Sequence, residues 1–243
     1  MASASEVIQR LDELVNDFSL RTRLFREPLT RGRAWMFVMQ HRLNTRQRNS
    51  VLKLRVATNC PDWDTRIAVI KACTQELIAD NEFADGRPHW LLLEDLGVTV
   101  GLERERIRNA QPLPSTRMAW LAWDSLMSNR HWLEGLVANT CAERPNVPGY
   151  GDGTFRQLGW FGYERTRWSK LFNLKDEELI FFGVHEKADI EHSDLGWNAV
   201  AKFADQLHMA DRVIEACRTN LLVWEHYLNG IVEAGDALGR SES

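Results

Sequence analysis

The sequence of 243 residues has few cysteines and no long apolar run, and each absence excludes a class of protein. The four cysteines lie far apart and form no Cys-x2-Cys pair, which argues against a zinc ribbon or a disulfide scaffold and fits a reducing compartment; they are Cys60, Cys73, Cys141 and Cys217. No segment reaches the roughly 18 apolar residues that a membrane span needs. The N-terminus also lacks the basic start and apolar stretch of a signal peptide. We therefore expect a cytoplasmic protein without a membrane partner.

Charge of one sign is not in excess either. The formal net charge is −4 at pH 7, so we expect no basic surface that would attract nucleic acid. Hydrophobic residues make up 44% of the chain and charged residues 26%, which is ordinary for a globular protein. The length suffices for one sizeable core. We predict a single helical domain over residues 1–243, with frayed tails at 1–4 and 235–243.

Strand patterns are missing as well. No alternating apolar and polar segment is bounded by turn residues, and apolar residues instead recur at helical spacing, as at Val7, Leu11 and Val15. This periodicity predicts an all-α bundle of seven to eight helices. The expected helices include residues 5–18, 31–58, 61–81, 116–142, 154–172, 175–207 and 210–233.

The run His185-x3-Asp189-x2-His192 lies within the predicted helix 175–207. Steps of four and seven residues return to within about 40° of the starting direction on an α-helix, so one face presents two imidazoles and a carboxylate. This set suits non-haem iron or manganese if further carboxylates complete it. The alternative is structural, because a histidine in a helix is more often a surface or hydrogen-bonded core residue than a ligand.

Three further residues could complete the set. Glu82 and His89 are two turns apart if a helix continues between them, although Gly86 and Pro88 weaken it there. Glu143 follows the nearly apolar end of the predicted helix 116–142, so we expect its carboxylate in the interior, where it is costly unless paired or bound to metal. Carboxylates and histidines from separate helices are the means by which bundles build two-metal sites.

The spacing of these residues resembles the haem-oxygenase-like di-iron oxidases and oxygenases, a family related to pyrroloquinoline quinone synthase and the chlamydial para-aminobenzoate-forming protein. The family pattern is Glu-x6-His, then a Glu, then His-x3-Asp-x2-His, and it falls here on Glu82, His89, Glu143, His185, Asp189 and His192. The resemblance implies a haem-oxygenase-like bundle in which these six residues bind two Fe, loaded as Fe2+, with Mn as an alternative in one position. It further implies dioxygen as co-substrate, an optional external electron donor and a homodimer.

The resemblance also implies an activity: N-oxygenation or oxidative C–C cleavage of a small amino-acid-derived or amine metabolite in a biosynthetic pathway. For the substrate we consider Arg156, Tyr163 and Arg165 of the predicted helix 154–172, since a positioned arginine can bind a carboxylate; the alternative is a solvated basic face. Two other functions remain open. One is a metal-independent enzyme on the same scaffold, similar to pyrroloquinoline quinone synthase or thiaminase, and the other is an interaction protein with structural histidines.

Overall fold

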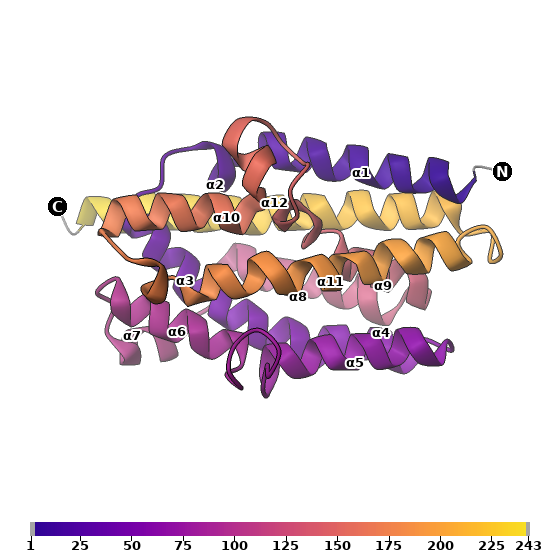
Figure 1. Cartoon of the computed structure of the whole chain (residues 1–243), viewed down its shortest axis with the longest axis horizontal. Helices are drawn as coiled ribbons and strands as arrows, with labels where there is room; N and C mark the ends of the chain where they lie inside the picture. The colour runs from indigo at the N-terminus through magenta and orange to yellow at the C-terminus, as the bar shows by residue number, and fades with distance from the viewer. Residues whose placement is uncertain (1–2, 242–243) are drawn as a thin grey trace.

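The computed structural model describes residues 3–241, which form helices and turns without a β-strand (Figure 1). The helices run roughly along the long axis of the molecule. They are α1 (Ala4–Arg21), α2 (Arg23–Arg26), α3 (Arg31–Gln47), η1 (Arg48–Lys53), α4 (Leu54–Asn59), α5 (Trp63–Leu77), α6 (His89–Thr99), α7 (Arg104–Arg108), α8 (Pro114–Ser128), α9 (Trp132–Thr140), η2 (Arg144–Asn146), α10 (Gly153–Phe172), η3 (Asp176–Glu178), α11 (Ile180–Phe203) and α12 (Ala210–Ser241). The all-α prediction is confirmed.

The structure divides the chain into more helices than the seven to eight predicted. The predicted helix 116–142 is two helices, because α8 ends at Ser128 and a new helix begins after His131. His131 caps α9 by accepting a hydrogen bond from the backbone N–H of Leu133, while Glu134 accepts from the His131 N–H. The predicted helix 31–58 is interrupted by η1, a π-helical segment, and α2 and α7 are additional short helices.

The ends of the described chain are helical where frayed tails were expected. At the start of α1, Ser3 Oγ accepts a hydrogen bond from the Glu6 N–H, and the Ser3 N–H donates to the Glu6 carboxylate, which forms a capping box. The helix α12 continues through the expected tail to Ser241. Asp236 holds it by accepting from Arg33 Nε at 2.5 Å. Residues 1–2 and 242–243 of the predicted tails lie outside the described residues.

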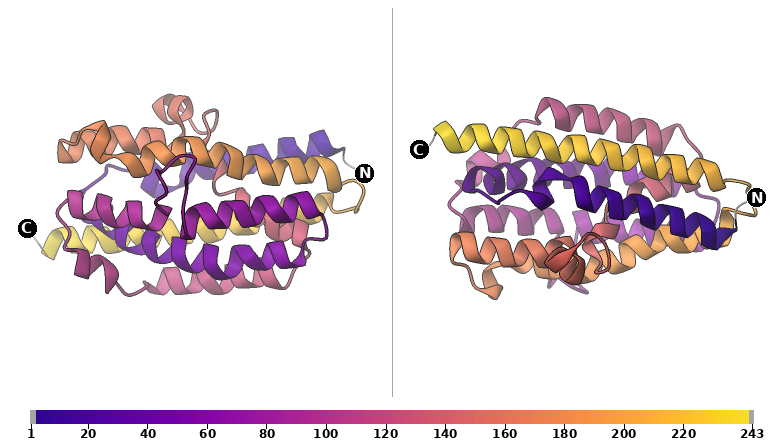
Figure 2. Two further views of the ribbon diagram at one scale, coloured as in Figure 1. Left: turned by 60° about the horizontal axis from the view of Figure 1, so that its bottom comes forward. Right: turned by 90° about the horizontal axis from the view of Figure 1, so that it is seen from above.

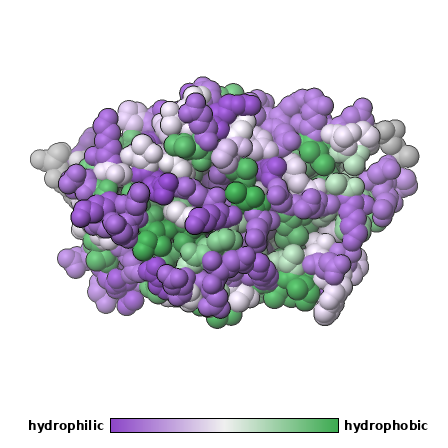
Figure 3. Space-filling model, viewed as in Figure 1, coloured by the Kyte–Doolittle hydropathy of each residue, from purple (hydrophilic) through white to green (hydrophobic). Residues whose placement is uncertain are grey.

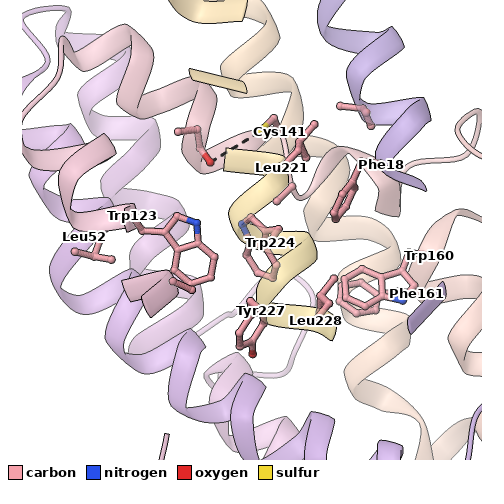
Figure 4. Packing of buried hydrophobic residues seen from close by; sticks show 14 of the residues in the cluster. Phe18, Leu52, Trp123, Cys141, Trp160, Phe161, Leu221, Trp224, Tyr227 and Leu228 are labelled. Carbon is pink, nitrogen blue, oxygen red and sulfur yellow. Dashed lines mark hydrogen bonds between the residues drawn. The ribbon is translucent and has the colours of Figure 1, made fainter. Parts of the chain in front are cut away.

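The longest helix, α12, lies along the middle of the bundle and packs on α1, α3, α8 and α9 (Figure 2). The predicted stripe on α1 is buried, with Val7, Leu11 and Val15 each at most 1% exposed. Trp224 and Tyr227 of α12 lie against Trp123 of α8 in the apolar interior (Figure 4). The face in Figure 3 is largely hydrophilic, with hydrophobic residues scattered over it. Among the described helices, none is both long and apolar enough to cross a membrane.

Candidate metal centre

Six side chains from separate helices and turns bring ligand atoms together inside the bundle. They form two groups, Glu76 with His89 and His185, and Glu143 with Asp189 and His192, and the ligand atoms within each group lie within 4.8 Å of one another. Five of the six residues expected from the sequence are in these groups. Glu82 is not, and Glu76 stands in its place.

The helix expected between Glu82 and His89 does not form, and this corrects the placement of Glu82. The helix α5 ends at Leu77, and Asp80 then accepts hydrogen bonds from the backbone N–H groups of Glu82 and Phe83, at 2.9 and 3.0 Å. This turn directs Glu82 outward, where its side chain is 44% exposed and pairs with Lys71 at 2.9 Å. The thin loop between α5 and α6 is visible in Figure 1.

Glu76 reaches the interior because it lies in the last turn of α5, on the buried side of the helix. Val69, Ala72 and Cys73 precede it at helical spacing and are buried, and Glu76 itself is 6% exposed. A carboxylate that continues an apolar stripe is a signal that the sequence contains. Reading that stripe through position 76 would have identified this donor.

Each histidine of the two groups has one ring nitrogen held by an acceptor outside the cluster. His89 Nε2 lies 2.8 Å from Asp80 Oδ2, His185 Nδ1 lies 2.7 Å from the Phe181 carbonyl oxygen, and His192 Nε2 lies 3.0 Å from Gln75 Oε1. An N–H donated to each acceptor leaves the lone pair of the other ring nitrogen directed into the cluster. This is how metal-binding histidines are usually oriented.

The helix α11 presents His185, Asp189 and His192 together, as the spacing predicted, and the three residues are 6%, 3% and 4% exposed. Asn146 of η2 donates to Asp189 Oδ2 at 2.7 Å and so fixes that carboxylate. The position of η2 in turn depends on Gly159, which has a φ of 72° inside α10 and packs directly on the Asn146 carbonyl group. A Cβ added at position 159 would collide with that carbonyl oxygen, so only glycine fits there.

Glu143 lies in the turn between α9 and η2 rather than at the end of a long helix. Its Oε1 is 3.4 Å from an Arg48 guanidinium nitrogen and 3.5 Å from Lys53 Nζ. Its Oε2 is buried and has no hydrogen-bond partner, and the same is true of His192 Nδ1. Buried polar atoms without partners are rare, and here both belong to the second ligand group.

The protonation of the cluster follows from burial and mutual attraction. Burial opposes the charged form of His89, but the Glu76 carboxylate and the hydrogen bonds to Glu76 and Asp80 outweigh it and raise the pKa of His89 to about 9. Burial likewise opposes the charged form of Glu76, yet its attraction to His89 holds the Glu76 pKa well below the usual value. Burial and the neighbouring His89 lower the pKa of His185. Without metal, the proton of the first group is therefore held on His89.

A cavity of about 40 Å³ lies beside the ligand groups. The wall opposite the ligands comes from α3 and η1, whose buried face is unusually polar, and the remaining wall comes from α10 and α12. Besides ligands, its lining comprises His41, Asn44, Thr45, Arg48, Asn49, Ala142, Asn146, Trp160, Phe161 and Trp224. Burial lowers the pKa of His41 to about 3, so this imidazole is neutral.

The structure does not bring the expected substrate residues to this cavity. Arg156 is exposed and donates to the Gly151 carbonyl oxygen at 3.4 Å. Arg165 pairs with Glu186 at 3.0 Å, and Tyr163 lies beneath the guanidinium of Arg167. The helix α10 contributes Trp160 and Phe161 to the cavity instead, because the kink at Gly159 separates them from the exposed face of the preceding turn.

The residues present fit two metal ions. The first group offers two imidazoles and one carboxylate, and the second offers one imidazole and two carboxylates, which are the donors that ferrous iron and manganese accept. A cation beside Glu143 and His192 would satisfy the two buried atoms that lack partners. The surroundings are buried on all sides by helices, as in bundle proteins that hold two metals.

Comparisons with known proteins agree with this architecture. No protein-family model matches the chain. A curated relative, 4-aminobenzoate synthase of Nitrosomonas europaea, is 26% identical over 157 residues, which cover 64% of this chain and 59% of the relative's length. The crystal structure of a domain of unknown function with a haem-oxygenase-like fold, from Shewanella denitrificans OS217, superposes with a TM-score of 0.72 and 12% identity over 96% of this chain and 93% of that one. The chain therefore has the haem-oxygenase-like fold.

Proposed function

We propose that the protein is a non-haem di-iron oxidase or oxygenase, which uses dioxygen to oxidise a small amino-acid-derived or amine metabolite by N-oxygenation or oxidative C–C cleavage. The observation that carries the proposal is the pair of ligand groups inside the bundle, each of which combines imidazole and carboxylate donors from different parts of the chain. The similarity to a 4-aminobenzoate synthase supports an enzymatic function on this scaffold.

When bound in the two groups, ferrous iron would supply the electrons that reduce dioxygen. The chain's own part is to hold and orient the donors. Asp80, Gln75 and the Phe181 carbonyl fix the three imidazole rings, and Asn146 fixes the Asp189 carboxylate. Arg48 and Lys53 hold Glu143 through its Oε1, and its Oε2, which has no partner, would be available to a metal.

Water is excluded from this site by aromatic residues. Phe161 lies with its ring centroid 4.9 Å from that of His185, and Trp160 and Trp224 complete the apolar part of the cavity wall. Apolar walls limit the access of water to this part of the cavity, which protects reactive intermediates from side reactions with solvent. We further propose a cytoplasmic homodimer that acts on a small molecule, with manganese as an alternative in one position and an external electron donor where the reaction needs one.

The test is iron content after anaerobic loading with ferrous iron and desalting. We expect about two irons per wild-type chain. Glu76→Gln should lose iron, because it removes a buried ligand, whereas the matched variant Glu82→Gln should retain it, because Glu82 faces solvent. Circular dichroism of each variant shows whether it is folded.

Three results would contradict the proposal or part of it. A folded wild-type chain that takes up no iron would favour a metal-independent enzyme on this scaffold or an interaction protein. Unchanged iron content in Glu76→Gln would refute the ligand groups described above. Loss of iron in Glu82→Gln alone would show that the spacing in the sequence, rather than the turn at Asp80, selects the ligand.

A further inference from the structure

Two buried cations, Arg48 and Lys53 of η1, lie beside the second ligand group. Arg48 is 5% exposed and Lys53 is 1% exposed. Both contact the same atom, Glu143 Oε1, at 3.4 and 3.5 Å. Within residues 3–241, Glu143 is the one carboxylate at ion-pair distance from either cation.

The charges of the loaded site do not balance without an added anion. The carboxylates of Glu76, Asp80, Glu143 and Asp189 carry four negative charges, and two divalent metal ions would cancel them. The positive charges of Arg48 and Lys53 would then have no counter-charge in the interior. Uncompensated buried charge is strongly unfavourable, so the loaded site favours an anion.

Arg48 also has one hydrogen-bond donor without an acceptor. One terminal nitrogen donates to the Asn139 carbonyl oxygen and the other to Glu143, but its Nε–H has no acceptor, although the residue lines the cavity. Trp224 lines the cavity too, and its Nε1–H is likewise buried and without an acceptor. Two buried donors without acceptors, on residues that line the same cavity, indicate a missing acceptor.

The position of the guanidinium is fixed by aromatic rings. Its Cζ lies 5.8 Å from the ring centroid of Trp123 and 5.2 Å from that of Trp224, two indoles that Figure 4 shows side by side. A planar guanidinium packed against a pair of indoles is suited to bind a carboxylate. The cavity of about 40 Å³ has room for a group of a few atoms.

We propose that the substrate carries a carboxylate and that Arg48 binds it in the cavity beside the metal centre. The Trp224 N–H contributes a second hydrogen bond, and Lys53 stabilises the anion at longer range. This assignment rests on the proposed di-iron function, since the charge imbalance arises only with metal bound. It places the arginine that recognises the substrate on η1 rather than on α10.

Acetate is a suitable probe because it is a carboxylate of the size of the cavity, and acetamide is its neutral counterpart. Binding is measured anaerobically on the ferrous protein, from the shift of the thermal unfolding midpoint with probe concentration at constant ionic strength. Iron content is measured on each sample. We expect acetate to bind the wild type and to bind Arg48→Met at least tenfold more weakly, with acetamide giving no comparable shift. The control is Arg46→Met, which removes an exposed cation from the neighbouring turn and should leave acetate binding unchanged.

Arg48→Lys covers the case in which Arg48→Met fails to fold. It keeps the charge but loses the Nε–H and the planar fork, so we expect several-fold weaker binding of acetate. Equal affinity in the wild type and the folded Arg48 variants would overturn the assignment, as would equal shifts with acetate and acetamide or no binding of acetate to the iron-loaded wild type. A wild type without iron would refute the di-iron proposal and this one together, and the iron measurement identifies that result.

Discussion

The packing of Gly159 against η2 allows the coupling between fold and site to be tested by one substitution, Gly159→Ala. At this residue φ is 72° and ψ is 172°, a conformation that is essentially limited to glycine and that costs an L-residue about 1–3 kcal/mol. The added Cβ would also collide with the Asn146 carbonyl oxygen and lie 2.7 Å from its carbonyl carbon. These are backbone atoms, so η2 must move, and overpacking of this kind costs roughly 1–3 kcal/mol. The expected loss of unfolding free energy is therefore about 2–6 kcal/mol.

Gly153→Ala is the matched control. Gly153 also has a positive φ, 52°, but a Cβ added there would meet nothing within 4 Å. The unfolding free energy of this variant should therefore fall by about 1–2 kcal/mol, from backbone strain alone. Urea unfolding followed by circular dichroism gives both values. Because η2 carries the amide that holds Asp189, Gly159→Ala should also release iron to a chelator faster than Gly153→Ala does. Equal losses of stability and equal rates of release in the two variants would refute the coupling.

Two further predictions concern buried carboxylates outside the metal centre. Burial raises the pKa of Glu164 from 4.5 to about 7, so the folded chain binds this proton more tightly than the unfolded chain does. Glu164 therefore lowers the free energy of unfolding increasingly as the pH rises from about 4.5 to 7. The unfolding free energy of Glu164→Gln, measured relative to the wild type by denaturant unfolding, should therefore rise by on the order of 3 kcal/mol between pH 4.5 and pH 8. A difference between the two proteins that does not depend on pH would contradict this. Glu94 is fully buried and pairs with Arg42 at 2.5 Å, so Glu94→Ala should lose roughly 3–5 kcal/mol by leaving that arginine unpaired. The partly exposed neighbour Asp95 is the control, since Asp95→Ala should lose no more than about 1 kcal/mol in the same assay.

The parts of the site that depend on local geometry could be predicted from the sequence. His185, Asp189 and His192 share a face of α11 because positions four and seven apart on any α-helix do so. Their burial agrees with this, and the carboxylate of Glu143 does lie in the interior, with its side chain 13% exposed. The helical class of the fold follows from the same periodicity.

The placement of Glu82 was wrong because it depends on where α5 ends, although the apolar stripe of α5 contains the signal for Glu76. The spacing from Glu82 to His89 is informative only if the helix continues. The Asp80 carboxylate ends that continuity by accepting two backbone N–H groups, and Gly86 follows with a φ of 76°. This choice between turn and helix depends on a side-chain hydrogen bond that hydrophobic periodicity does not report.

The wall of the cavity was missed for a different reason, which connects the fold to the proposed chemistry. His41 and Asn44 of α3 are buried although they are polar, and so are Arg48 and Asn49 of η1. This stretch therefore has only a weak apolar stripe, and its inward face cannot be recognised from the sequence. The partners of Arg48 on Asn139 and Glu143 are about 90 residues away in the chain. An interior that departs from the apolar pattern is unfavourable for folding and is expected mainly where a site requires it. The polar wall from α3 and η1 is thus evidence for a ligand in its own right, because six of the buried atoms that lack partners, Arg48 Nε among them, belong to residues that line this cavity.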